Sequence, residues 1–303
     1  MNSHYFSTPI LFLIFNRPDT TKKVFDKIRQ LRPRLLFISA DGPRPDKTGE
    51  GEKCKAARNI IQHIDWTCEV RTNFLEKNLG CRVAVSSGID WFFSHVPEGI
   101  ILEDDCCPDL SFFPFCETML GTYRSQERIM HVGGTNFQDG RLRGDGSYYI
   151  SNLGHVWGWA TWKRAWQKYD VDIPTFRSEE HRLLELFPDR RTRAYWQKNF
   201  ESVYYKKKDT WDYQWQYALS TNNGLAIIPN VNLISNIGFD ANATHTTGGF
   251  PVLANRPTGK MDNIRHPKII TPDLQADEYT FRKYLQPNKL TKLWRLLRHY
   301  FPQ

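Results

Sequence analysis

The sequence predicts an α/β protein with a mostly parallel sheet and helices on both of its faces. Continuous apolar runs of strand length recur in the first third of the chain, as is typical of strands buried on both faces. Segments with helical spacing of apolar residues separate these runs. Strands that alternate with helices pair in parallel, and such sheets bind ligands at the carboxyl ends of their strands.

The elements of the first third follow in that order along the chain. Asp19 is placed to begin the first helix, and the second strand ends in the turn Asp41-Gly42-Pro43. The last strand of this part leads directly into Glu103. We expect strands at 9–15, 35–40, 68–74 and 99–102, and helices at 19–28, 48–64 and 82–95.

The rest of the chain has a less regular pattern and no internal repeat. Glycine-rich loops break up a mixed region, and a charged helical stretch and one further strand follow it. We place the mixed region at 129–166, the helical stretch at 179–208, the strand at 225–229, a polar loop at 242–259 and a basic amphipathic helix at 290–301.

Composition excludes several classes of protein. With 40% hydrophobic and 24% charged residues in 303, the chain is neither disordered nor a membrane bundle. No apolar run approaches the ~20 residues that a spanning helix needs. The net charge of +8 favours phosphate-bearing partners or anionic lipid surfaces. The six cysteines form no CxxC pair and no export signal precedes them, so we expect reduced thiols in a cytoplasmic protein.

The sharpest candidate site is the acidic triplet Glu103-Asp104-Asp105 at the end of an apolar strand. Three successive carboxylates repel one another and are costly to bury there. A hard divalent cation such as Mg²⁺ or Mn²⁺ removes the conflict, with diphosphate oxygens and water as its other ligands. The alternative is a solvated acidic turn.

Three further polar groups match a nucleotide diphosphate. Asn16 and Arg17 follow the first strand, where an arginine is well placed for a diphosphate. Asp41 follows the second strand, where a carboxylate accepts the imide N–H of a uracil. Arg82 lies near a helix N-terminus, which attracts phosphate. Taken singly, these are more often turn or surface residues.

Aromatic segments farther along supply candidates for sugar contacts and catalysis. The segment from Gly154 to Trp162 holds three indoles, which stack on sugars or pack in a core. Asp212 beside Trp211 is a candidate general base in a partly dry site, or else a helix cap. His245 is a candidate metal or diphosphate contact, or else a solvated loop residue.

These segments together resemble a GT-A nucleotide-sugar glycosyltransferase, most closely the inverting N-acetylglucosaminyltransferase I type and its bacterial relatives. The likeness spans about 8–245 and is most specific at the triplet. It rests on Pro9 to Arg17, Ser39-Ala40-Asp41-Gly42, the helix with Arg82, Gly99 through Asp105, and Pro108-Asp109-Leu110-Ser111-Phe112-Phe113.

The resemblance implies a role for each matching residue. It implies that Asp105 binds Mn²⁺, and that Glu103 and Asp104 contact the nucleotide sugar. Arg17 and Asp41 match nucleotide contacts, while Arg82 stands where the family has a histidine. Gly158-Trp159 resembles a Gly-Trp segment of the family. Trp211-Asp212 resembles the Trp-Asp-Asp-Trp element that holds the catalytic base, with Tyr213 in place of the second Asp. The segment 172–208 looks like an insertion that shapes the acceptor side.

We therefore expect a single Rossmann-like GT-A domain over 1–265, with a nucleotide-sugar half at 1–120 and an acceptor half at 121–265. A C-terminal extension at 266–303 carries the basic helix. The expected reaction moves a sugar from a UDP-sugar to a hydroxyl of a glycan or lipid-linked glycan acceptor, with inversion and with Mn²⁺ or Mg²⁺, in surface polysaccharide or lipopolysaccharide synthesis. GDP- and dTDP-linked donors stay open. No nucleic-acid partner is expected.

Two other functions and one question of location stay open. A nucleotidyltransferase that makes NDP-sugars also uses a parallel sheet and an acidic metal site, but no glycine-rich triphosphate loop follows the first strand. A non-catalytic module that binds glycan or nucleic acid is the third function. The basic C-terminal helix either docks on an anionic membrane from the cytoplasmic side or packs on the catalytic domain.

Overall fold

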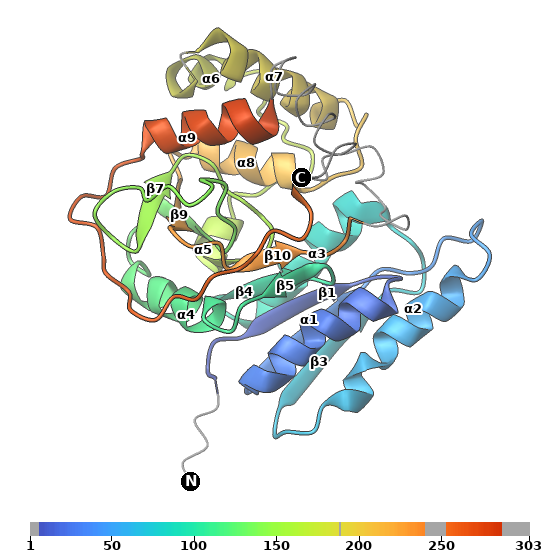
Figure 1. Ribbon diagram of the computed structural model, residues 1–303. Helices are drawn as coiled ribbons and strands as arrows, with labels where there is room; N and C mark the ends of the chain where they lie inside the picture. Colours follow the sequence, from blue (N-terminus) through green and yellow to red (C-terminus); the bar gives the residue numbers. More distant parts are fainter. Residues whose placement is uncertain (1–5, 188, 240–252, 287–303) are drawn as a thin grey trace, which may run out of the picture.

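The structure, a computed structural model, describes residues 6–187, 189–239 and 253–286. A sheet of eight strands runs through it in the order β3-β2-β1-β4-β8-β6-β9-β7 (Figure 1). Its strands are β1 (Ile10–Ile14), β2 (Leu35–Ala40), β3 (Glu69–Phe74), β4 (Glu98–Glu103), β6 (Ile129–Gly133), β7 (Tyr148–Ser151), β8 (Trp159–Trp162) and β9 (Leu225–Pro229).

The pairing of the first four strands brings their carboxyl ends to one edge. β1 is parallel to both β2 and β4, and β2 is parallel to β3. In the β1–β4 register Leu13 pairs with Glu103. β8 lies antiparallel between β4 and β6, while β9 is parallel to β6. The predicted α/β class with a mostly parallel sheet is confirmed.

Helices cover both faces of this sheet, as predicted, because successive residues of β1 point to opposite sides. Ile10 and Phe12 pack with α1 (Pro18–Leu31), α2 (Glu50–Arg58) and α4 (Phe112–Thr122). Leu11 and Leu13 pack with α3 (Gly80–His95), α5 (Lys163–Trp166) and α8 (Asp212–Thr221). The apolar runs of the sequence are thus strands covered on both sides.

A further layer lies on the outer side of α8. There α6 (Glu180–Leu186) and α7 (Arg190–Tyr204) build a separate aromatic cluster around Phe176 and Phe200. α9 (Leu274–Thr280) and the π turn Phe281–Leu285 run beside them (Figure 1). The Asp277 carboxylate accepts hydrogen bonds from Ser151 Oγ and from the backbone and side chain of Asn152, so this segment is tied to the end of β7.

Some elements differ from the prediction for local reasons. The polar helix expected over 48–64 is α2 followed by a 3₁₀ turn, Asn59–His63, because few apolar residues hold it against the sheet. The two-stranded ribbon of β5 (Cys106–Pro108) and β10 (Ile234–Asn236) was not predicted, since three-residue strands carry little periodicity.

Several expectations concern the surface and the ends of the chain. All six cysteines have free thiols. Among the described residues no helix has the length and apolar character that crossing a bilayer requires. The basic helix expected at 290–301 and most of the loop at 242–259, including His245, lie outside the described residues.

Gly99, in β4, has no room for a side chain and gives the first prediction. A Cβ there would lie 2.3 Å from Phe92 Cζ and 2.8 Å from the Pro9 carbonyl oxygen. Since the Phe92 ring packs against Phe37, Gly99→Ala should lower the free energy of unfolding by about 1–3 kcal/mol. A Cβ on Gly121, in α4, would meet no atom within 4 Å. Gly121→Ala should therefore raise the free energy of unfolding by about 0.4–1 kcal/mol. Urea unfolding measures both, and equal effects would contradict this account.

Candidate functional site

An arginine joins the ends of β1 and β4. Arg17 donates from Nη2 to Asp104 Oδ1 at 2.6 Å, and its Nη1 lies 3.0 Å from Asp105 Oδ2. The Phe15 backbone N–H donates to the other oxygen of Asp104 at 3.2 Å. Burial lowers the pKa of Arg17, but attraction to Asp104 and Asp105 outweighs it and the pKa lies above its ordinary value. The pairing of parallel strands thus brings these predicted residues together.

The acidic triplet carries more negative charge than Arg17 neutralises. Burial raises the pKa of Glu103, and repulsion from Asp105 and Asp104 raises it further. Burial also raises the pKa of Asp104, while Arg17 opposes that rise. The Glu103 side chain has no hydrogen-bonding partner among the described residues. Burial of these carboxylates beside a single arginine is costly, and a cation would reduce that cost.

The carboxylates at the end of β4 fit a metal ion that is coordinated mainly by a bound diphosphate and water. Among the described residues no three His, Cys, Asp or Glu side chains form a metal cage. One oxygen of Asp105 contacts Arg17, and the other accepts from the Cys106 thiol at 3.4 Å. These groups match a Mg²⁺ or Mn²⁺ site in which one or two carboxylates bind and diphosphate oxygens and water supply the rest. Metal binding by Asp105 and His245 stays a prediction.

The segment after β10 lies directly over this ion pair. The Ile237 N–H donates to the Asp105 carbonyl oxygen at 2.8 Å. A Cβ on Gly238 would lie 2.2 Å from Asp105 Oδ2 and 2.6 Å from Arg17 Nη1. A side chain at position 238 would therefore require Asp105 and Arg17 to shift, so the segment after β10 packs closely against the pair.

Asp41 and Asn16 occupy the same edge, after β2 and β1. The Asp41 carboxylate accepts hydrogen bonds from the Gly42, Leu79 and Gly80 N–H groups and from Asn78 Nδ2. Burial raises its pKa, and the backbone donors oppose that rise. Asn16 Nδ2 donates to Glu50, while its Oδ1 is buried without a partner. That orphaned acceptor fits a donor on a nucleoside.

The N-terminus of α3, where Arg82 was expected to meet phosphate, is capped by a carboxylate. Asp209 accepts from the Cys81 and Arg82 N–H groups at 3.0 and 2.9 Å. The Arg82 guanidinium contacts Asp172 at 3.1 Å. A phosphate here would have to displace or avoid Asp209. Its contact with Arg82 stays a prediction.

The indole-rich segment divides between the core and the surface. Trp159 and Trp162 are fully buried, whereas Trp157 is partly exposed. Trp159 stacks on His131 at 5.2 Å and on Trp211 at 5.7 Å between ring centroids, so its faces are covered. The alternative that the sequence left open, core packing, describes Trp159. Gly158 has φ +60° and contacts Ile234 closely, which lets this turn lie against β10.

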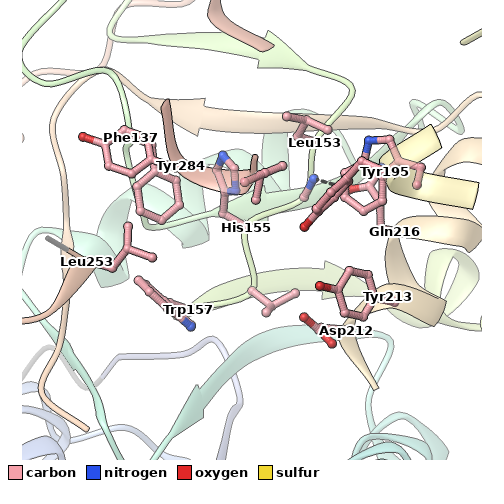
Figure 2. A pocket seen from close by; sticks show the side chains of 14 residues that line it. Phe137, Leu153, His155, Trp157, Tyr195, Asp212, Tyr213, Gln216, Leu253 and Tyr284 are labelled. Atoms are coloured by element: carbon pink, nitrogen blue, oxygen red, sulfur yellow. Dashed lines mark hydrogen bonds between the residues drawn. The ribbon is translucent and has the colours of Figure 1, made fainter. Parts of the chain in front are cut away.

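Asp212 is the first residue of α8 and faces a pocket with a cavity volume of about 170 Å³. The Thr210 hydroxyl donates to one of its carboxylate oxygens. Figure 2 shows Phe137, Tyr284 and Trp157 on one side of the pocket and Asp212 and Tyr213 on the other. The wall also includes Leu153, His155, Tyr195, Tyr213, Gln216 and Leu253.

Electrostatics link this pocket to the acidic edge. Burial raises the pKa of the Cys81 thiol, and four carboxylates raise it further: Glu103, Asp209, Asp212 and Asp41. Asp212 also contributes to the raised pKa of Glu103. The charge of Asp212 therefore acts on Glu103, the first residue of the triplet, although α8 and β4 are distant in sequence.

Asp139 anchors the far wall of the pocket. Its carboxylate accepts hydrogen bonds from Lys283 Nζ, Arg256 Nη2 and the hydroxyls of Tyr279 and Tyr284. These donors hold its pKa well below the usual range, although burial opposes them. These hydrogen bonds to Asp139 hold the π turn, and with it Tyr284, against the pocket.

Comparisons with known proteins give only remote structural likeness. No protein-family model and no curated protein matches the chain. HddC from Yersinia pseudotuberculosis matches with 11% identity over 54% of this chain and 80% of its own, at a TM-score of 0.35. A cytidylyltransferase from Leptospira borgpetersenii matches with 10% identity over 62% of this chain and 73% of its own, at a TM-score of 0.32. The 4-diphosphocytidyl-2C-methyl-D-erythritolsynthase from Anaerococcus prevotii matches with 12% identity over 60% of this chain and 85% of its own, at a TM-score of 0.31. Such TM-scores carry no functional argument.

Sequence reasoning missed most of the pocket wall. Trp157, His155 and Tyr213 were within quoted segments but were not proposed as contacts. Tyr195 lies in the segment 172–208 that was expected to shape the acceptor side, whereas Tyr284 comes from a region assigned no site. Gly158 was one signal in the sequence. A glycine between Trp157 and Trp159 allows a turn that leaves one indole partly exposed and the other buried.

Removal of Arg17 should expose the cost of the buried carboxylates. Arg17→Met should lower the free energy of unfolding by about 3–5 kcal/mol, because Asp104 is left buried without its cation. The double variant Arg17→Met/Asp104→Asn should recover part of that loss. Denaturant unfolding of both variants and of Asp104→Asn measures the coupling, and strictly additive effects would contradict the ion pair.

Asp139 gives a prediction with a definite pH dependence. Its pKa is depressed in the folded state, so its contribution is full above the unfolded pKa of about 3.9 and is lost as pH falls below it. Asp139→Asn keeps a residue tolerated at its φ of +53° but removes the charge. We expect a loss of about 1–3 kcal/mol at pH 7 and a smaller loss at pH 3. Urea unfolding at both pH values checks this, and an equal loss would refute it.

Proposed function

We propose that the protein is a metal-dependent glycosyltransferase that moves a sugar from a UDP-sugar to a hydroxyl of a glycan or lipid-linked glycan, with inversion. One arrangement carries the proposal. The carboxylates at the end of β4 pair with Arg17, and Asp212 lies within their electrostatic reach while it lines a pocket. Such an arrangement holds a charged leaving group beside a base.

The nucleotide half of the reaction belongs to the edge formed by β1, β2 and β4. Asn16 Oδ1, buried without a partner, accepts from the nucleoside, and Arg17 faces the diphosphate from the end of β1. A Mn²⁺ ion at Asp105 would neutralise charge on the leaving diphosphate. Glu103 and Asp104 then contact the nucleotide sugar, as the family resemblance implies.

The acceptor half belongs to Asp212. Thr210 fixes one oxygen of the carboxylate, which leaves the other to take the proton of the acceptor hydroxyl. Proton removal accompanies attack of that hydroxyl on the anomeric carbon, and the bond to the diphosphate breaks on the opposite side. A single displacement of this kind inverts the configuration.

A nucleotidyltransferase is the second candidate, the activity named for the structure from Leptospira borgpetersenii. Both classes of enzyme combine a parallel sheet with an acidic metal site. The connection between β1 and α1 favours the glycosyltransferase, because it consists of Phe15, Asn16 and Arg17 alone and contains no glycine. Three residues offer few N–H groups for a triphosphate.

Thermal shift with Mn²⁺ and UDP tests the nucleotide half. A ligand at 100 times its Kd stabilises the fold by about 2.7 kcal/mol, so the native protein should melt at a higher temperature. Asp105→Asn should lose the metal-dependent part of that shift. Asp212→Asn should keep it and lower transfer by about 10²–10⁴-fold. UDP binding that needs neither metal nor Asp105 would instead support a non-catalytic module.

A second assay separates the two enzyme classes. Incubation with a panel of UDP-sugars and Mn²⁺ should release UDP, by transfer or slow hydrolysis. Incubation with UTP or CTP and sugar 1-phosphates should release no pyrophosphate. Pyrophosphate release without UDP release would overturn the glycosyltransferase in favour of the nucleotidyltransferase.

A further inference from the structure

We propose that the pocket beside Asp212 binds an uncharged pyranose ring of the acceptor and rejects a ring that carries a carboxylate or phosphate. The inference rests on the proposed function and adds the chemical class of the acceptor. It starts from the side chains that line the pocket, in which aromatic rings predominate and hydroxyl, amide and imidazole groups are few (Figure 2).

The charge of the wall is the first argument. Among its described residues Asp212 is the one charged side chain, and no lysine or arginine is present. Two cations lie behind the rings of the wall and bind groups outside it. Arg256 lies 5.2 Å from the ring centre of Tyr284 and pairs with Asp139 at 3.0 Å. Lys208 lies 4.6 Å from the ring centre of Tyr213 and donates to Asn199. An anionic sugar in the pocket would thus contact the Asp212 carboxylate and no cationic side chain of the described wall.

The size and position of the pocket identify which substrate it holds. Its volume of about 170 Å³ is below the ~300–1,000 Å³ of sites for drug-sized ligands, so it suits a single ring rather than a nucleotide. Arg17 and the acidic triplet are not part of its wall. The sugar attached to the diphosphate is bound at that edge. The ring in the pocket is therefore the acceptor, which meets the donor at Asp212.

Two groups supply the contacts that a neutral sugar requires. The Trp157 indole is partly exposed and is held edge-to-face by Phe137 at 5.8 Å and by Phe239 at 5.6 Å, a rigid platform for sugar C–H groups. The His155 side chain is 9% exposed, and no described residue hydrogen-bonds to its ring. Because burial lowers its pKa to about 4, the imidazole is neutral and offers one donor and one acceptor to sugar hydroxyls.

Saturation-transfer NMR with methyl glycosides of glucose, galactose and N-acetylglucosamine tests the proposal, with methyl glucuronide as the anionic match. At least one neutral glycoside should receive saturation and the glucuronide should not. Trp157→Ala should weaken binding about tenfold. His155→Phe keeps the shape and packing of the ring, removes its nitrogens and should weaken binding about fivefold. Tyr205→Ala, an exposed tyrosine outside the pocket, is the control and should change nothing.

UDP binding with Mn²⁺, measured in the same variants, separates this inference from the proposed function. The expected result is unchanged UDP binding in Trp157→Ala and His155→Phe. If UDP binds but the glucuronide binds as well as its neutral match, or both variants bind glycosides normally, the acceptor assignment is wrong and the proposed function stands. If the neutral glycosides bind through Trp157 but UDP never binds, the pocket assignment stands and the glycosyltransferase is wrong.

Discussion

The pairing of Arg17 with Asp104 and Asp105 is the constraint on which the site depends. It joins the ends of two strands that are adjacent in the sheet but 87 residues apart in sequence. Without the guanidinium, a buried carboxylate at the end of β4 would remain uncompensated, which costs several kcal/mol. With it, one positive charge faces three carboxylates. Arg17 thus offsets only part of the negative charge that this end of the sheet would carry with all three carboxylates ionised.

A second set of contacts positions Asp212, the proposed base, on the face of the sheet that α3, α5 and α8 cover. Trp215 Nε1 donates to His131 Nδ1 at 3.1 Å, and His131 Nε2 then donates to the His155 carbonyl oxygen. Burial lowers the pKa of His131 to about 3, so this chain of hydrogen bonds stays neutral. Trp159 stacks between His131 and Trp211, the residue before Asp212. The buried indoles therefore position the carboxylate and the pocket wall together, without contacting a substrate.

The sequence predicted those features that local patterns encode. Apolar runs predicted the bounds of β2 and β9 closely, because strands covered on both faces are almost entirely apolar, with Ser39 the one polar residue of β2. The triplet stood out because Glu103, Asp104 and Asp105 directly follow such a run. The pocket could not be predicted. Trp157 comes from a loop, and Tyr195, Tyr213 and Tyr284 come from three different helical segments. Each aromatic side chain alone is equally compatible with a core position.

The two halves of the site differ in the physical basis of recognition. In the proposed function, charges at the edge of β1, β2 and β4 would select the ligand, because an arginine and several carboxylates suit a diphosphate that brings its own cation. In the pocket, rings and neutral polar groups select by shape and hydrogen bonds, and Asp212 disfavours anions. Contacts outside the pocket hold the cations behind its rings: Arg256 pairs with Asp139, and Lys208 donates to Asn199. Neither cation is therefore part of the wall that surrounds Asp212.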